Sequence, residues 1–122
     1  TLEAGLAAIC GDQGGVLKVD AEGIEVDILE AARSLLMSQH PAILVEILPA
    51  YSPDHRFRVG RQERLVRLVQ QLGYVLHEVV LNSDNSLGVR RVEAIEVHAD
   101  PRRTDYLALP VGDATLAAVQ VA

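Results

Sequence analysis

The stretch Val16-Leu17-Lys18-Val19-Asp20-Ala21-Glu22-Gly23-Ile24-Glu25 decides the fold of this chain. It begins as a short apolar strand, continues into an acidic turn that ends in Gly23, and then feeds a helix. This order is typical of α/β proteins, in which ligands bind beyond the carboxyl ends of the strands. Asp20 and Glu22 stand at such an end, so the sequence predicts a binding site there.

The rest of the chain alternates between two kinds of apolar pattern. Apolar residues at helical spacing predict helices over residues 2–10, 24–38 and 61–72. Short runs of apolar and β-branched residues predict strands over residues 16–20, 42–48, 74–81, 93–98 and 105–109. The long helix is expected to bury Ile24, Ile28, Ala31, Ala32, Leu35 and Leu36, with Glu25 off that stripe. Residues 49–60 are expected to form an irregular loop.

The connections between these elements predict a mixed sheet. The first two strands flank one helix, and a right-handed crossover makes them parallel. The later strands are joined too closely for helices, so they are expected to be antiparallel and to form a meander. We therefore expect an α/β domain over residues 1–110, with a sheet of four or five strands and helices on its faces. Residues 111–122 are expected to form a C-terminal tail.

Charge and composition exclude several classes of protein. The net charge is −6 and aromatic residues make up 3% of the chain, which disfavours nucleic-acid binding. We interpret the arginines at positions 56, 58, 61, 64 and 67 as a solvated helix face. No apolar run is long enough for a membrane span, so no membrane partner is expected. The single cysteine, Cys10, fits a reducing compartment, and we expect a cytoplasmic protein.

Three segments carry a family resemblance. They are Leu17-Lys18-Val19-Asp20-Ala21-Glu22-Gly23-Ile24-Glu25, Leu29-Glu30-Ala31-Ala32 and Pro41-Ala42-Ile43-Leu44-Val45-Glu46-Ile47. Together they resemble the FkbM family of S-adenosylmethionine-dependent methyltransferases. That family has a K-I-D-V-E-G-x-E turn from strand to helix, followed by a P-x-I-L-x-E-I strand. Thr1-Leu2-Glu3, Leu72-Gly73-Tyr74 and Asp105-Tyr106-Leu107-Ala108-Leu109-Pro110 also resemble it.

The resemblance implies a Rossmann-like methyltransferase fold, of which this sequence is the C-terminal half. Residues 16–20 and 42–48 would be the fourth and fifth strands of the family's seven-stranded sheet, and the meander would supply the sixth and seventh. In that sheet these four strands are contiguous, so the half could fold alone. A start at Thr1, inside an expected helix, also suggests a fragment.

The family holds its methyl donor, S-adenosylmethionine, largely on a glycine-rich loop after the first strand. Here Gly11, Gly14 and Gly15 do not follow a strand and open a helix, as that loop must. We therefore expect this chain to be inactive alone and to bind S-adenosylmethionine weakly or not at all.

By resemblance, Asp20 lies near the donor and the acceptor and is the leading catalytic candidate. It would orient the acceptor hydroxyl, take its proton, or hold a metal that does so; the alternative is a carboxylate that binds the amides of its own turn. Glu22 and Gly23 would complete the cofactor-binding turn, although Glu22 also suits a helix start electrostatically.

Glu46 is the second catalytic candidate, because an acid inside an apolar strand is costly unless it has a partner. A structural pair with Lys18 or an arginine is the alternative. His40, His55, His77 and His98 show no metal-ligand spacing, so no metal site is predicted.

The resemblance thus implies methyl transfer to a hydroxyl oxygen of a sugar or another small natural product. The alternative comes from a different class, a non-enzymatic α/β interaction module. If the strand over residues 16–20 has lost a neighbour, it is an exposed apolar edge that can pair with another chain. We therefore expect a homo-oligomer formed through this edge or its flanking helices.

Overall fold

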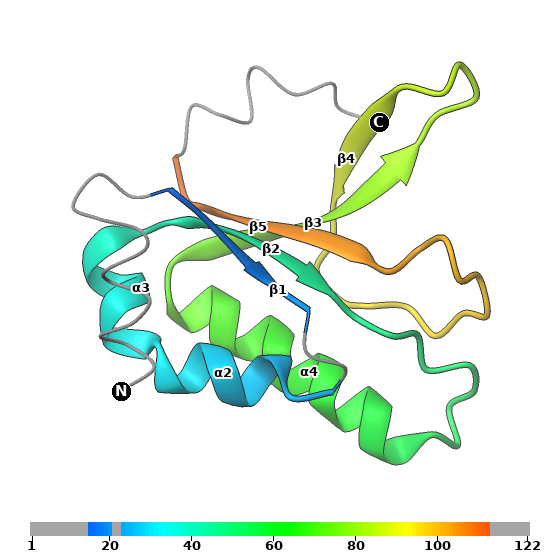
Figure 1. The fold of residues 1–122 in the computed structure, drawn as a ribbon. Helices are drawn as coiled ribbons and strands as arrows, with labels where there is room; N and C mark the ends of the chain where they lie inside the picture. Colours follow the sequence, from blue (N-terminus) through cyan, green and yellow to red (C-terminus); the bar gives the residue numbers. More distant parts are fainter. Residues whose placement is uncertain (1–14, 21–22, 113–122) are drawn as a thin grey trace.

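The computed structural model describes residues 15–20 and 23–112, which form a sheet with helices packed against it (Figure 1). In chain order the elements are β1 (Val16–Val19), α2 (Glu25–Ala31), α3 (Arg33–Gln39), β2 (Ala42–Glu46), α4 (Arg56–Gln71), β3 (Tyr74–Leu81), β4 (Leu87–Arg91) and β5 (Asp105–Pro110). The helix expected over residues 2–10, the site candidate Glu22 and the tail from residue 113 lie outside the described residues.

The five strands form one mixed sheet in the order β1-β2-β5-β3-β4. β1 is parallel to β2, and the remaining pairs are antiparallel. The expected α/β class, the five-stranded mixed sheet and the parallel first pair are therefore confirmed. The expected meander is wrong, because β5 does not follow β4 at the edge. Instead β5 lies between β2 and β3 and pairs with both of them.

In the described part of the chain, α2, α3 and α4 all lie on one face of the sheet (Figure 1). Alternate strand residues, such as Leu17 and Val19 in β1 and Ile43 and Val45 in β2, are buried in one core cluster with residues of these helices. Because successive strand residues point to opposite faces, Lys18 and Glu46 belong to the other face. Within residues 15–20 and 23–112, the expected helices on the faces of the sheet are confirmed for one face.

The helix expected over residues 24–38 is two helices, α2 and α3, which meet at Ala32. At Ala32 the backbone angles are φ −94° and ψ 11°, outside the helical range. The buried stripe agrees with the expected one at Ala32, Leu35 and Leu36 and differs before them: Ile24 is 53% exposed, and Val26 and Leu29 are buried instead. The helices are rotated so that Val26 and Leu29 face the sheet and α4, and Glu25 is buried with them.

Two further boundaries differ from expectation. α4 begins at Arg56, so the end of the expected loop is helical, and the Val59 amide already donates to the carbonyl of His55 at 3.0 Å. β4 covers Leu87–Arg91, whereas residues 93–98 form no strand in the structure. The turn before β4 brings Leu87 opposite Leu81, which makes a hairpin with β3.

A buried ion-pair network fixes the chain that leads into β5. Glu78 of β3 is 2% exposed and accepts hydrogen bonds from Arg90 of β4 and from Arg103, whose Nε lies 2.6 Å from Oε1. Burial alone would raise the pKa of Glu78, but the two guanidinium groups outweigh it and hold the pKa below its usual value. A backbone bond of 2.8 Å from the Ile47 amide to the carbonyl of Thr104 anchors the same segment to the chain after β2.

None of the helices within residues 15–20 and 23–112 combines the length and the apolar character that crossing a bilayer requires.

Candidate functional site

Three carboxylates meet at one end of the sheet. Asp20 directly follows β1 and Glu46 is the last residue of β2, and the pairing of Val19 with Val45 makes the two acids neighbours. Glu46 is also paired with Asp105, the first residue of β5. The sequence predicted the first two acids and the adjacency of their strands, whereas Asp105 was not recognised as a site residue.

Glu46 shows the electrostatic effect of this arrangement. Repulsion from Asp20, then burial, then repulsion from Asp105 raise the pKa of Glu46, and a hydrogen bond with the Asp20 side chain adds to the rise. Lys18 opposes the shift only in part, and within the described residues Glu46 makes no ion pair with a lysine or an arginine. Glu46 is therefore a stronger base than an ordinary carboxylate, and it stands beside a second, exposed acid.

Among the residues that the structure describes, no three His, Cys, Asp or Glu side chains come together as a group that could hold a metal ion. Glu46, with its raised pKa and its hydrogen bond to the Asp20 carboxyl group, is suited to holding and moving a proton.

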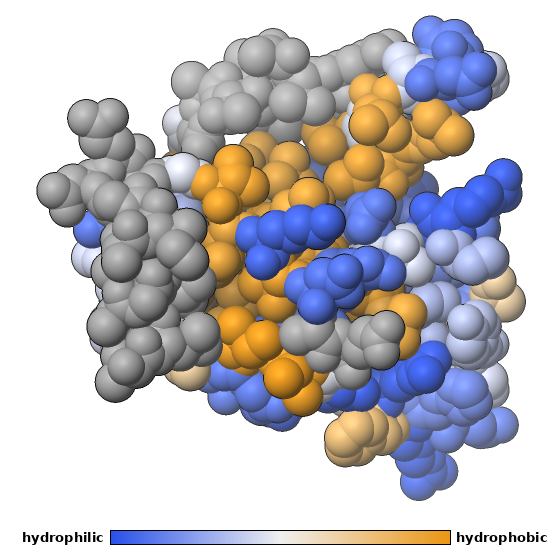
Figure 2. Space-filling model, viewed as in Figure 1, coloured by the Kyte–Doolittle hydropathy of each residue, from blue (hydrophilic) through white to orange (hydrophobic). Residues whose placement is uncertain are grey.

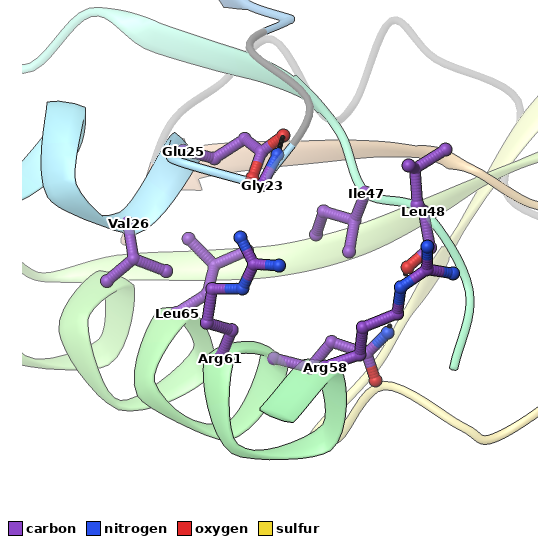
Figure 3. A pocket seen from close by; sticks show the side chains of 9 residues that line it. Gly23, Glu25, Val26, Ile47, Leu48, Arg58, Arg61 and Leu65 are labelled. Carbon is purple, nitrogen blue, oxygen red and sulfur yellow. Dashed lines mark hydrogen bonds between the residues drawn. The ribbon is translucent and has the colours of Figure 1, made fainter. Parts of the chain in front are cut away.

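A small pocket lies at the same end of the sheet, on the side that the helices cover (Figure 3). Its volume is about 80 Å³. The lining residues are Gly23, Glu25, Val26, Ile47, Leu48, Arg58, Arg61, Gln62 and Leu65. The pocket is close to the acids along the chain, because its lining residue Ile47 directly follows Glu46 and its lining residue Gly23 lies three positions after Asp20. The acids and the pocket thus occupy opposite faces of the same sheet end.

Gly23, predicted as a cofactor-binding residue, forms one wall of this pocket. Its φ is +108°, and a Cβ atom built there would lie 2.3 Å from Nη1 of Arg61, so no larger residue fits without displacing that arginine. The Gly23 amide donates to Oε1 of Glu25 at 2.9 Å. Glu25 is 7% exposed, so the expectation that it lies off the buried face is wrong; its carboxylate is needed to hold the turn.

Two arginines of α4 form the opposite wall. Arg58 donates to the carbonyl of Pro49 at 3.0 Å, and Arg61 lies over the ring of Phe57, with 4.6 Å between the guanidinium carbon and the ring centroid. Arg64, one turn further on, bonds Glu30 on the surface at 3.2 Å. The interpretation of the basic cluster as a solvated face is therefore correct for the exposed Arg56, Arg64 and Arg67. It is wrong for Arg58 and Arg61, which line the pocket.

The size of the pocket bears on the methyl donor. Sites for molecules as large as S-adenosylmethionine enclose roughly 300–1,000 Å³. The pocket beside Gly23 has about 80 Å³, so it does not accommodate the whole donor. The pocket beside Gly23 is therefore not by itself a complete donor site.

Comparison of the chain with models of protein families, with curated proteins and with solved structures found no match in any of the three. The function of the chain is therefore inferred from its residues and their geometry.

Proposed function

We propose that this chain is the acceptor-side part of a methyltransferase that uses S-adenosylmethionine. In this proposal the methyl group goes to a hydroxyl oxygen of a sugar or another small natural product. The observation that carries the proposal is the pair of Asp20 and Glu46 at the ends of two parallel strands, with the pKa of Glu46 raised by its neighbour.

The sheet supports this reading. The resemblance to the FkbM family requires the strands equivalent to β1, β2, β3 and β5 to be contiguous. In the structure β1, β2, β5 and β3 are successive neighbours. A Rossmann-like half-fold of this kind would place the turn that contains Asp20 at the ligand-binding edge of the sheet.

In this proposal Asp20 and Glu46 have different roles toward the acceptor hydroxyl. Asp20 is exposed and accepts a hydrogen bond from the acceptor hydroxyl, which fixes the direction in which its oxygen lone pair points. Glu46, whose pKa is raised, takes the hydroxyl proton as the new carbon–oxygen bond forms and the carbon–sulfur bond of the donor breaks. The proton passes between the two carboxyl groups through the hydrogen bond that they share. The methyl donor has to be held by residues other than those described.

The test uses the protein expressed from the complete reading frame. Its upstream sequence should contain a strand followed by a Gly-x-Gly-rich loop. Transfer of labelled methyl groups from S-adenosylmethionine to sugars and small hydroxylated compounds is then measured. Asp20→Asn and Glu46→Gln should each lower kcat by about 100-fold or more. Glu63→Gln is the matched control, because Glu63 is exposed on α4 and makes no ion pair in the described part of the chain.

Absence of transfer to every acceptor, or full activity of Asp20→Asn, would refute the proposal. A second measurement is calorimetric titration of the present chain with S-adenosylhomocysteine. The expected result is weak binding or none, whereas tight binding would show that this chain holds the donor and would contradict the acceptor-side assignment.

A second candidate function is self-association through the sheet edge. β1 is the outermost strand on its side of the described sheet, and Val16 is 67% exposed. Hydrophobic residues gather over the sheet in the view of Figure 2, around the position that β1 has in Figure 1. An exposed apolar edge strand is a template for pairing with a second copy.

Sedimentation velocity at high concentration tests this candidate. Val16→Lys should dissociate an edge-paired oligomer, because a charge on an edge strand opposes pairing. Leu81→Lys, at a residue of β3 that is 65% exposed, is the control and should leave the oligomer intact. A monomer at all concentrations would exclude the interaction module.

A further inference from the structure

The pocket beside Gly23 carries an excess of positive charge in an acidic protein. Among the described residues that line it, the charged side chains are Arg58, Arg61 and Glu25, which sum to +1. The whole chain has a net charge of −6. Placing two cations in one concave site of such a chain is electrostatically favourable when an anion binds between them.

Both guanidinium groups lack a carboxylate partner within the described residues. Five other arginines do form ion pairs there, namely Arg64, Arg90, Arg91, Arg102 and Arg103. Arg58 and Arg61 are held by neutral groups instead. Arg58 bonds a backbone carbonyl and lies 5.7 Å from the centroid of the Tyr51 ring, and Arg61 is stacked on Phe57. These contacts orient the two groups and leave their charge uncompensated.

The exposure of Phe57 supports a role in binding. The Phe57 side chain is 77% exposed, so it contributes little to the core. Its contact with Arg61 places the planar guanidinium in a fixed orientation beside Gly23, where the missing Cβ leaves room for it. A guanidinium held in this way can bind a carboxylate or a phosphate through two parallel hydrogen bonds.

The wall of the pocket also offers a hydrogen-bond acceptor. Oε1 of Glu25 binds the Gly23 amide, and within the described residues Oε2 of Glu25 has no hydrogen-bond partner. Figure 3 shows Glu25 and Gly23 on one side of the pocket and the two arginines on the other. A ligand that carries both an anionic group and hydroxyl groups would match these donors and this acceptor.

The volumes indicate how such a ligand would lie. The pocket of about 80 Å³ has room for an anionic group and little more. Arg58 and Arg61 also line an open hollow of about 450 Å³, together with Asp54, His55, Arg56 and Phe57. We propose that Arg58 and Arg61 bind the carboxylate or phosphate of a small hydroxylated acid, with the rest of the molecule in this hollow. The proposal does not depend on methyl transfer.

Titration of the chain with four probes tests it, without any methyl donor. The probes are glucose 6-phosphate, glucuronate, inorganic phosphate and uncharged glucose, each followed by calorimetry and by amide NMR shifts up to about 10 mM. At least one of the two sugar anions should bind, and glucose should not. The stronger of the two identifies whether the site prefers phosphate or carboxylate. Inorganic phosphate should compete with the sugar anion that binds.

Variants on α4 distinguish anion binding by Arg58 and Arg61 from nonspecific attraction to the positive charge of the helix surface. Arg58→Gln and Arg61→Gln should each weaken anion binding by about tenfold or more, since each removes a charge-assisted donor pair. Arg67→Gln removes the same charge from the exposed surface of α4 and should change affinity less than about twofold. Arg61→Lys keeps the positive charge but removes the paired N–H donors of the guanidinium group, so it should give an intermediate loss of anion affinity.

Circular dichroism and thermal unfolding check that each variant folds. The proposal is overturned if no anion binds, if glucose binds as well as its charged derivatives, or if Arg67→Gln weakens binding as much as Arg61→Gln. Failure here would leave the methyl-transfer proposal untouched, because this experiment involves neither the donor nor the carboxylates of the other sheet face.

Discussion

Glu78→Gln should destabilise the protein more than any substitution of an exposed acid. The carboxylate of Glu78 is 2% exposed and binds Arg90 and Arg103, so its loss leaves two guanidinium groups facing a neutral amide. Breaking a buried ion pair of this kind costs about 3–5 kcal/mol. Because the side chains of Arg90 and Arg103 are 47% and 30% exposed, both can turn toward water. We therefore expect the lower end, about 3 kcal/mol, which corresponds to a fall in Tm of roughly 10 °C for a chain of this size.

Chemical denaturation at several pH values measures this effect. The folded pKa of Glu78 is lowered, so its contribution to stability is complete above its unfolded pKa and is lost as the pH falls through the folded pKa. The difference in unfolding free energy between wild type and Glu78→Gln should therefore shrink in acid. Glu93→Gln is the control, since Glu93 is 75% exposed and pairs with Arg91 at the surface. A loss in Glu78→Gln no larger than that of the control would refute the reasoning.

Two further predictions concern the candidate site. Gly23→Ala should lower the free energy of unfolding by about 1–3 kcal/mol and weaken anion binding, because its φ is positive and the new methyl group collides with Arg61. Gly60→Ala is the control in thermal unfolding. It should stabilise the protein by about 0.5–1 kcal/mol, because Gly60 lies inside α4 and a methyl group there meets no other atom. Glu46→Gln should unfold at a higher temperature than wild type at pH 7 and lose this advantage near pH 4, since a raised folded pKa makes the native state less stable as Glu46 ionises. Glu63→Gln, at an exposed position of α4, is the control in the same thermal unfolding series.

The part of the fold around residues 16–25 could be predicted from local patterns. β1 and β2 are short apolar runs on either side of a helical segment, and the handedness of that crossover makes them parallel. Once these strands are adjacent, Asp20 and Glu46 have to be neighbours. The position of β5 could not be predicted in this way, because antiparallel strands with short connections are compatible with several orders along a sheet.

Helix rotation and helix boundaries depended on tertiary contacts. Residues 24–36 contain two overlapping apolar stripes, and only the contact with α4 and the sheet selects the one with Val26 and Leu29 over the one with Ile24. Gly60 suggested the end of a loop, yet it lies inside α4, whose first turns also hold Arg58 and Arg61 with their contacts to Pro49 and Phe57.

The arginine pocket was missed for a related reason. On a helix, a basic residue that faces water and one that faces a pocket have the same spacing, so the sequence did not separate Arg61 from Arg64. The signal available in the sequence was an aromatic residue, Phe57, one turn before Arg61, whereas the burial of Gln62 is visible only in the structure.

The proposed function depends on the pair of Asp20 and Glu46. An NMR titration of the side-chain carboxyl carbons tests this pair most directly. We expect Glu46 to titrate above its ordinary pKa of 4.5 in the wild-type chain. In Asp20→Asn the pKa of Glu46 should fall toward that value, because the largest cause of the rise is removed, and in Glu63→Gln it should not change. A Glu46 that titrates at or below 4.5, or that does not respond to Asp20→Asn, would contradict the account.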